Sequence, residues 1–267
     1  MATFILIHGA FQGAWVWRET AALLRAGGHE VLTPELTGLG GRAHLLTEGQ
    51  GLSGYVADVA NAVAFSLCGP AVFVGHSFSG LVAAAAAARF PGLARGLMFV
   101  DALIPEPGRS FLDMAGPEFA KVLKAHVHDG WLVRPWPLPV FGVAEPELAP
   151  AFAARLTSTP LAAFAEPFAF PLPGPDLPRG FIRCTRNPNP FIEAQAAKAR
   201  AGGYGFTAID SGHAPMITAP QALALALREQ EALLGEPAAL PPGPAYHAER
   251  MQRAPLARSG VLPGDTP

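Results

Sequence analysis

The sequence predicts an α/β fold in which a doubly wound, mostly parallel sheet carries an inserted cap. Six apolar runs rich in β-branched or aromatic residues alternate with stretches that suit helices. Strands that are apolar on both faces and separated by helices are typical of a parallel sheet covered on both sides. The chain has 267 residues, half of them apolar, which is enough for one large domain with a substantial core.

Each predicted element has its own signal. The six expected strands lie at residues 3–9, 29–36, 70–76, 95–101, 180–185 and 204–210. The five expected helices lie at residues 14–28, 52–69, 79–92, 192–203 and 219–235. The first two helices stop at Gly27 and Gly69 and the fourth runs into Gly202, as expected for glycine C-caps. The core of the α/β fold is therefore predicted at residues 1–103 and 179–235.

Two segments depart from this alternation. Residues 104–178 hold half of the 28 prolines, with many Trp and Phe residues between them. A long irregular segment inside a compact domain is usually functional or disordered, and its aromatic content favours a functional cap over an apolar pocket. The expected lining is Phe11 from the core together with Trp131, Trp136, Phe164 and Phe168 from the cap. Residues 236–267 lack periodicity and predict a disordered tail.

Composition and charge exclude several function classes. A net charge of -2 provides no basic stripe, so nucleic acid is not an expected partner. Cys68 and Cys184 are too few for a disulfide framework or a thiolate zinc site, and "HVHD" at 126–129 is more typical of a solvated face than of a metal site. No phosphate loop or dinucleotide fingerprint occurs, so neither metal nor cofactor is expected. The start of the chain resembles neither a signal peptide nor a membrane span, and a cytoplasmic protein is expected. The oligomeric state stays open.

The most informative stretch is "VFVGHSFSGLVAAAAA", where an apolar strand runs through Gly75-His76-Ser77 into an Ala-rich helix. This is the context of a nucleophile elbow, in which small residues permit a sharp turn and expose the Ser hydroxyl at a helix N-terminus. Ser79 stands where such motifs usually carry their second Gly, and Gly80 follows one place later. The alternative is that Ser77 is an ordinary N-cap.

Two further stretches favour the catalytic interpretation. "ILIHGAFQGAWVW" would bring the Ala10 N–H toward Ser77, where it would form an oxyanion hole with the Phe78 N–H, although a plain strand-to-helix turn is the alternative. "AIDSGHAPMITAP" places His213 on a loop after the last strand, from which it can act as the base for Ser77. By itself such a histidine is more often structural. The three stretches together predict a serine nucleophile with its base.

The sequence resembles the α/β-hydrolase superfamily, within the branch of plant methyl-ester esterases, plant hydroxynitrile lyases and bacterial esterase-like relatives. The resemblance covers nearly the whole chain except the tail. It rests on six segments in family order, "HGAFQGAWVW", "LTGLGGRAHLL", "GHSFSG", "FVDALIPEPG", "FIRCTRNP" and "DSGHAPMITAP". It implies an α/β-hydrolase fold and a cofactor-free serine hydrolase whose partner is a small to medium apolar carboxylic ester.

One position departs from the family pattern. Relatives carry an Asp in the turn after the penultimate strand, where it orients the catalytic histidine, and this position falls on Asn187. An Asn can accept the Nδ1–H but supplies no charge and can favour the wrong tautomer. Three explanations are open. The favoured one is that the acid has moved to Asp101, although an Asp at this position can also serve only to hold the start of the cap in place. Otherwise Asn187 orients a slower triad, or the protein is a non-hydrolytic binding protein or biosynthetic cyclase.

The resemblance also bears on lyase activity. Hydroxynitrile lyases of this branch have a Thr where this chain has Gly9 and a Lys where it has Ala214, directly after the histidine. Without that Lys nothing obvious stabilises departing cyanide. Ester hydrolysis is therefore the preferred prediction.

Overall fold

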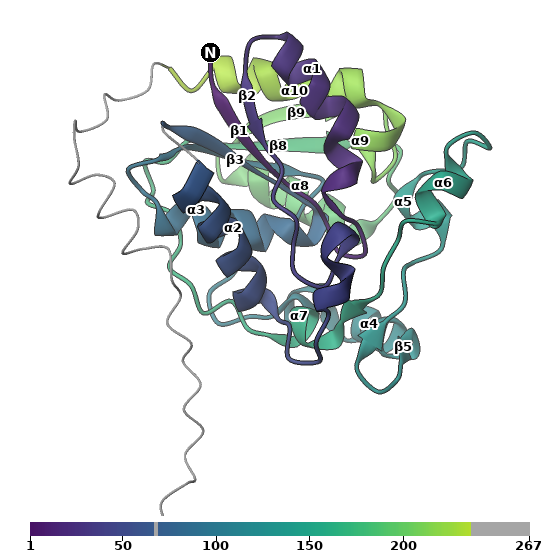
Figure 1. The fold of residues 1–267 in the computed structure, drawn as a ribbon. Coiled ribbons are helices and arrows are strands. Elements are labelled where there is room, and N and C mark those ends of the chain that lie inside the picture. Colours follow the sequence, from purple (N-terminus) through teal and green to yellow (C-terminus); the bar gives the residue numbers. More distant parts are fainter. Residues whose placement is uncertain (67–68, 236–267) are drawn as a thin grey trace, which may run out of the picture.

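The computed structural model describes residues 1–66 and 69–235, and it contains one six-stranded sheet with helices on both faces (Figure 1). All neighbouring strands of this sheet are parallel. From β1 the chain builds one edge and then returns past β1 to build the other, which confirms the doubly wound prediction. Across the sheet, the strands are β2 (Glu30–Leu32), β1 (Thr3–Ile7), β3 (Ala71–His76), β4 (Ala94–Val100), β8 (Arg179–Cys184) and β9 (Gly205–Ile209).

The longer helices cover both faces of the sheet. Helices α1 (Arg18–Ala26) and α10 (Pro220–Ala232) pack together on one face, and α2 (Leu52–Ser66) and α3 (Gly80–Arg89) pack together on the other (Figure 1). The Ala-rich α3 is buried along most of its length, because small side chains let it lie close to β3. The remaining core elements are α8 (Pro190–Ala201), α9 (Pro215–Thr218) and three 3-10 turns, η1 (Ala14–Trp17), η2 (Gly40–Leu45) and η3 (Ser77–Ser79).

The segment between β4 and β8 is more regular than the sequence predicts. It contains helices α4 (Phe111–Ala125), α5 (Leu138–Phe141), α6 (Ala149–Ala153) and α7 (Leu161–Ala165), and a small antiparallel sheet of β5 (Val127–His128), β6 (Leu132–Val133) and β7 (Thr159–Pro160). The expectation of an irregular segment is wrong for these stretches. Ser110 and Asp113 form a capping box that starts α4, and the positive φ of Gly116 accommodates Pro117 as a kink.

Hydrogen bonds join this inserted segment to two loops of the core. The Phe11 N–H donates to Thr159 Oγ1 at 2.9 Å, and the Phe11 carbonyl accepts from the Thr157 N–H at 2.8 Å. On the other side, the Ala214 N–H donates to the Phe141 carbonyl at 2.8 Å. The segment is thus held over the loops that carry Phe11 and Ala214, at the carboxyl edge of the sheet.

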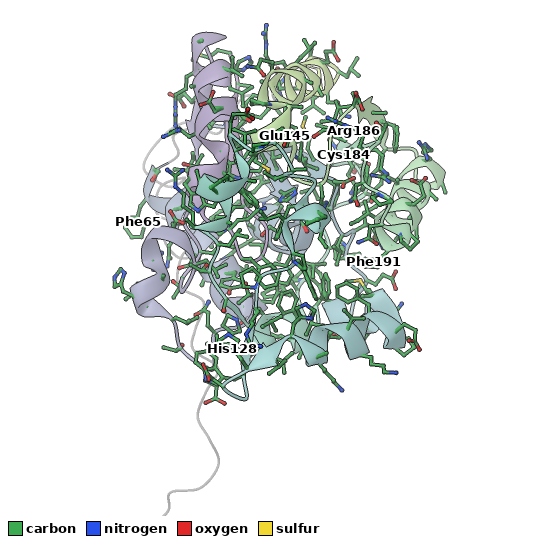
Figure 2. The ribbon with its side chains drawn as sticks, turned by 90° about the vertical axis from the view of Figure 1, so that its right-hand side faces the viewer. Phe65, His128, Glu145, Cys184, Arg186 and Phe191 are labelled. Atoms are coloured by element: carbon green, nitrogen blue, oxygen red, sulfur yellow. The ribbon has the colours of Figure 1, made fainter. Side chains whose placement is uncertain are left out.

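The remaining sequence predictions concern the stretch 126–129, metal sites, membrane spans, Cys68 and the tail. His128 of the stretch 126–129 lies at the outer end of the inserted segment (Figure 2). Its side chain contacts Asp129 and Ser158. Within the described residues, no group of three or more His, Cys, Asp or Glu side chains could hold a metal ion. In the same part of the chain, no helix combines the length and apolarity needed to cross a bilayer. Cys68 and the predicted tail at 236–267 lie outside the described residues.

Candidate active site

Ser77 sits at the tip of a sharp turn between β3 and α3. Its φ of 55° is uncommon for a residue other than glycine and is a form of strain found at functional sites. Two glycines permit the turn: a Cβ on Gly75 would lie 2.3 Å from the Ser79 carbonyl oxygen, and a Cβ on Gly80 would lie 2.1 Å from the Leu103 carbonyl oxygen. Gly80 therefore supplies the close packing that the second Gly of such motifs usually provides.

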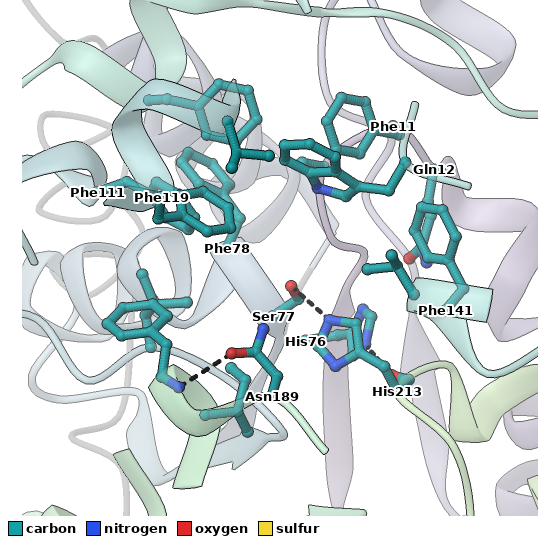
Figure 3. Close-up of a pocket in the computed structure, with 18 residues that line it drawn as sticks. Phe11, Gln12, His76, Ser77, Phe78, Phe111, Phe119, Phe141, Asn189 and His213 are labelled. Atoms are coloured by element: carbon teal, nitrogen blue, oxygen red, sulfur yellow. Dashed lines mark hydrogen bonds between the residues drawn. The ribbon is translucent and has the colours of Figure 1, made fainter. Parts of the chain in front are cut away.

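The structure brings Ser77, His213 and Asp101 into one hydrogen-bonded line, of which Figure 3 shows the part formed by Ser77 and His213. His213 Nε2 lies 2.9 Å from Ser77 Oγ, and its Nδ1 lies 2.8 Å from Asp101 Oδ2. Asp101 directly follows β4, Ser77 follows β3 and His213 follows β9 by a short loop. Parallel strands end at the same edge of a sheet, which is why residues far apart in the sequence meet there.

Asp101 is fully buried, and each of its oxygens has two hydrogen-bond donors. Arg183 Nη1 at 2.9 Å and the Cys184 N–H at 3.1 Å donate to Oδ1. His213 Nδ1 and Asn187 Nδ2, the latter at 2.6 Å, donate to Oδ2. Four donors saturate a carboxylate, which can only accept. His213 therefore carries its proton on Nδ1 and presents a bare Nε2 to the Ser77 hydroxyl.

The same contacts keep Asp101 ionised. Burial alone would raise the pKa of its carboxyl, because it disfavours the charged form. Hydrogen bonds from His213, Asn187 and the Cys184 N–H, together with attraction to His213 in its protonated form, outweigh burial and hold the pKa of Asp101 below its ordinary value. Asp101 is thus a carboxylate at neutral pH, in direct contact with the imidazole.

Asn187 contacts both Asp101 and His213. The Asn189 N–H donates to Asn187 Oδ1 at 3.1 Å, so the Nδ2 group must face the site. Nδ2 lies 2.6 Å from Asp101 Oδ2 and 3.1 Å from His213 Nδ1. Since both nitrogens carry hydrogen, they share Asp101 as their acceptor. In this geometry Asn187 is a second donor to the carboxylate.

Arg183 is a neighbour of the site that the sequence reasoning missed. It is buried on β8, pairs with Asp101 and donates from Nη2 to the Asn187 carbonyl at 2.6 Å. A signal for it exists in "GFIRCT", because an arginine inside an otherwise buried strand needs an acidic partner. Arg183 explains how a fully buried carboxylate is balanced by charge.

His76 packs behind the hydrogen-bonded line of Ser77, His213 and Asp101. It is fully buried, its Nε2 donates to the His213 carbonyl at 2.7 Å, and the two imidazole rings lie 4.9 Å apart. Burial, with the nearby His213 charge, lowers the pKa of His76 to about 3. His76 is therefore neutral and positions the loop of His213.

The buried His76 makes stability depend on pH. Its pKa is 6.5 ordinarily and about 3 in the fold, so its contribution is full above pH 6.5 and is lost as pH falls toward 3. Between pH 7 and pH 5 the wild type should lose about 2 kcal/mol more unfolding free energy than His76→Gln, by urea denaturation. The exposed His44 provides the control, and His44→Gln should keep the wild-type pH dependence. Equal losses in wild type and His76→Gln would contradict the assignment.

A cavity of about 250 Å³ lies directly above Ser77 (Figure 3). Ala10, Phe78 and His213 line it beside the serine. The rest of the wall is mostly aromatic, and the inserted segment contributes Phe111, Phe119, Trp136, Phe141 and Phe164. The core contributes Phe11 and Phe191. The arrangement suits an apolar molecule held over a serine hydroxyl.

Three of the five predicted pocket residues, Phe11, Trp136 and Phe164, line this cavity, whereas Trp131 and Phe168 do not. The Trp131 carbonyl accepts from the Leu161 N–H beside the small sheet. Phe168 packs its ring on Phe170. Proline-rich composition cannot tell which aromatic residues of a segment face inward. The lining residues that the sequence did not predict include Gln12, Phe111, Phe119, Phe141, Asn189 and Phe191.

Comparison with known proteins identifies the family of this chain. The model of the family described as alpha/beta hydrolase family matches residues 4–227. The chain belongs to the alpha/beta hydrolase family.

This alpha/beta hydrolase has esterases among its relatives. It is 36% identical over 153 residues to the carbendazim hydrolyzing esterase of Nocardioides sp. (strain SG-4G), and the aligned part covers 54% of this chain and 63% of that esterase. It is 33% identical over 105 residues to methyl jasmonate esterase 1 of Vitis vinifera, and the aligned part covers 39% of this chain and 40% of that protein. The aligned part thus spans less than two thirds of either relative.

Solved structures share the fold of this alpha/beta hydrolase. An extracellular alpha/beta-hydrolase from a Paenibacillus species superimposes with a TM-score of 0.76 at 23% identity, over 86% of this chain and 99% of that one. A pyrethroid hydrolase from Sphingobium faniae JZ-2 superimposes with a TM-score of 0.69 at 23% identity, over 86% and 98%. At these identities the likeness shows the alpha/beta hydrolase fold.

Proposed function

We propose that this alpha/beta hydrolase is a serine carboxylic-ester hydrolase for a small to medium apolar ester. The observation that carries the proposal is the line from Asp101 through His213 to Ser77, with spacings of 2.8 and 2.9 Å, at the floor of an apolar cavity. Nucleophile, base and orienting acid within hydrogen-bond reach are the signature of an activated serine. The esterases among the relatives support the same reaction.

In the proposed mechanism His213 Nε2 takes the proton of Ser77 as Oγ attacks the ester carbonyl. The N–H groups of Ala10 and Phe78 donate to the oxyanion that forms. The Asp101 carboxylate stabilises the imidazolium, which then gives its proton to the departing alcohol. Water activated by His213 releases the acid from Ser77 in the second half of the reaction.

We assign the inserted segment, residues 104–178, the role of a cap. Its aromatic side chains form most of the wall above Ser77, and it is hydrogen-bonded to the loop of Phe11 and to Ala214 beside His213. An apolar roof excludes water from the acyl group and strengthens the hydrogen bonds to the oxyanion. Substrate choice would follow from its shape.

The competing functions have less support. Asn187 is the one feature that favours a non-hydrolytic protein, but its amide donates to Asp101, and a carboxylate contacts His213 Nδ1 directly. For a hydroxynitrile lyase, Ala214 next to His213 provides no cation for departing cyanide. Ester hydrolysis needs neither an acid at position 187 nor a cation at position 214.

A serine-directed phosphonate tests the nucleophile. An activated Ser77 should form a covalent adduct with one equivalent of a p-nitrophenyl alkylphosphonate, which intact-mass and peptide mass spectrometry would detect. Ser77→Ala should form none. Ser79→Ala is the matched control, because Ser79 is two residues away but donates its hydroxyl to the His8 carbonyl at 2.5 Å, and it should still be labelled at Ser77. A folded wild type that resists labelling, or labelling at another residue, would refute the proposal.

A further inference from the structure

Gln12 is a polar residue in the wall of an otherwise largely aromatic cavity. It follows Phe11 in the loop after β1 and is fully buried. It is one of the residues that line the space above Ser77 (Figure 3). The proposed mechanism makes no use of it.

The orientation of the Gln12 amide follows from one contact. The Gly9 N–H lies 3.3 Å from Gln12 Oε1. A backbone N–H can only donate, so the atom it faces must be the amide oxygen. The Nε2 group is then the other end of the amide, and it is a donor. This buried nitrogen has no acceptor among the described residues.

The other polar groups at the cavity leave this donor unsatisfied. Ser77 Oγ is engaged with His213, and Asn189 Oδ1 accepts from the Phe191 N–H at 3.0 Å. His76 Nδ1 is buried and also without a partner, so no hydrogen bond joins it to Gln12. Buried donors are almost always paired, by protein, water or ligand. An acceptor for Gln12 must therefore come from within the cavity.

We infer that Gln12 Nε2 donates a hydrogen bond to an oxygen or nitrogen of the substrate outside the scissile carbonyl. The inference rests on the proposed ester hydrolysis and narrows its substrate class. The ester would carry an ether, carbonyl or ring-nitrogen acceptor in an otherwise hydrocarbon body. Water can satisfy Gln12 in the free enzyme, but an ester that fills the cavity displaces it and must replace its hydrogen bond. Gln12 is thus a specificity-determining residue.

Isosteric ester pairs test this inference. For the acyl side the pair is p-nitrophenyl 3-methoxypropanoate and p-nitrophenyl pentanoate, and for the alcohol side it is 2-methoxyethyl benzoate and butyl benzoate. In each pair an ether oxygen replaces a methylene of nearly equal size. The ratio of kcat/KM values, ether over hydrocarbon, should fall about tenfold or more from wild type to Gln12→Met in at least one pair. A ratio cancels any general effect of the substitution on the fold.

Two variants sharpen the comparison. Gln12→Glu keeps an acceptor for the Gly9 N–H and has no donor once its carboxyl is ionised, so above the pKa of that carboxyl it should lose the same preference. Val140→Ala alters an apolar part of the same wall and should leave the ratio unchanged. If Gln12→Met lowers kcat equally for both members of each pair, Gln12 acts on the oxyanion or the fold and the inference is wrong. Equal ratios of kcat/KM in wild type and Gln12→Met would also show that the inference is wrong.

Binding to Ser77→Ala separates this inference from the proposed function. Calorimetry measures affinity for the same esters without turnover, first in Ser77→Ala and then in Ser77→Ala/Gln12→Met. A Gln12-dependent preference for the ether ester, with no hydrolysis by wild type, would sustain the inference and overturn the esterase. Hydrolysis that requires Ser77 but shows no ether preference in rate or affinity would sustain the esterase and overturn the inference about Gln12. If the esters are neither bound nor hydrolysed, both proposals fall.

Discussion

Asp101→Asn is expected to lower kcat for p-nitrophenyl butyrate about 10⁴-fold, the loss that an Asp-to-Asn change causes in a serine protease triad. The carboxylate touches His213 Nδ1 at 2.8 Å, so its removal withdraws the charge that stabilises the imidazolium. An amide at position 101 can also present its NH2 to Nδ1 and impose the wrong tautomer. Steady-state kinetics at matched folded concentrations, with circular dichroism as the folding check, measure the effect.

Asn187→Asp separates the relocated acid from a weakened triad. If Asn187 were the orienting group, an Asp there would raise kcat. We expect kcat near neutral pH to fall, because the new carboxylate would replace a donor 2.6 Å from Asp101 Oδ2. Two carboxylates so close cannot both ionise readily and would share a proton. A kcat above the wild-type value would show that Asp101 is not the working acid.

The exchanged variant Asp101→Asn/Asn187→Asp provides an internal check. Asn187 Nδ2 lies 3.1 Å from His213 Nδ1, so a carboxylate at 187 is also within reach of the imidazole. The exchanged variant should therefore recover part of the activity that Asp101→Asn loses. No recovery, together with an unchanged unfolding free energy, would indicate that Asp101 acts through more than its charge on His213.

Gly80→Ala is expected to lower the free energy of unfolding by about 3 kcal/mol or more, the upper range for overpacking a tight site. The added Cβ would lie 2.1 Å from the Leu103 carbonyl oxygen and 3.0 Å from Phe99 Cδ1. The backbone near Leu103 cannot yield easily, since the Leu103 N–H donates to the Ser77 carbonyl at 3.1 Å. Urea denaturation measures the loss, and kcat should fall with it because the elbow is displaced.

Gly92→Ala is the matched control for this prediction. Gly92 lies in the turn before β4, and a Cβ there would meet no atom within 4 Å. Its stability should stay close to that of the wild type. A small effect of Gly80→Ala, similar to that of Gly92→Ala, would contradict the view that the start of α3 lies too close to the chain after β4 for any side chain at position 80.

Much of the fold follows from local patterns. Apolar runs separated by helical stretches predict all six strands of the parallel sheet, with boundaries shifted by a few residues at β1 and β2. The small residues around Ser77 predict the turn between β3 and α3. These features depend on neighbours within a few residues, so a linear pattern contains them. The same holds for His213, whose place after the last strand predicts its position at the edge of the sheet.

Local sequence patterns do not predict which side chains of the site form hydrogen bonds with one another. The sequence alone leaves Asp101 and Asn187 as rival candidates for one role, whereas the fold places them together, with Asn187 donating to Asp101. Which end of the Gln12 amide faces the cavity is settled by the Gly9 N–H. The linear sequence is enough to predict the six strands in their order along the chain, the turn at Ser77 and the loop of His213. Which polar groups pair depends on the folded chain, because hydrogen bonds require short distances and suitable directions between segments as far apart in the sequence as Ser77 and His213, which are separated by 136 residues.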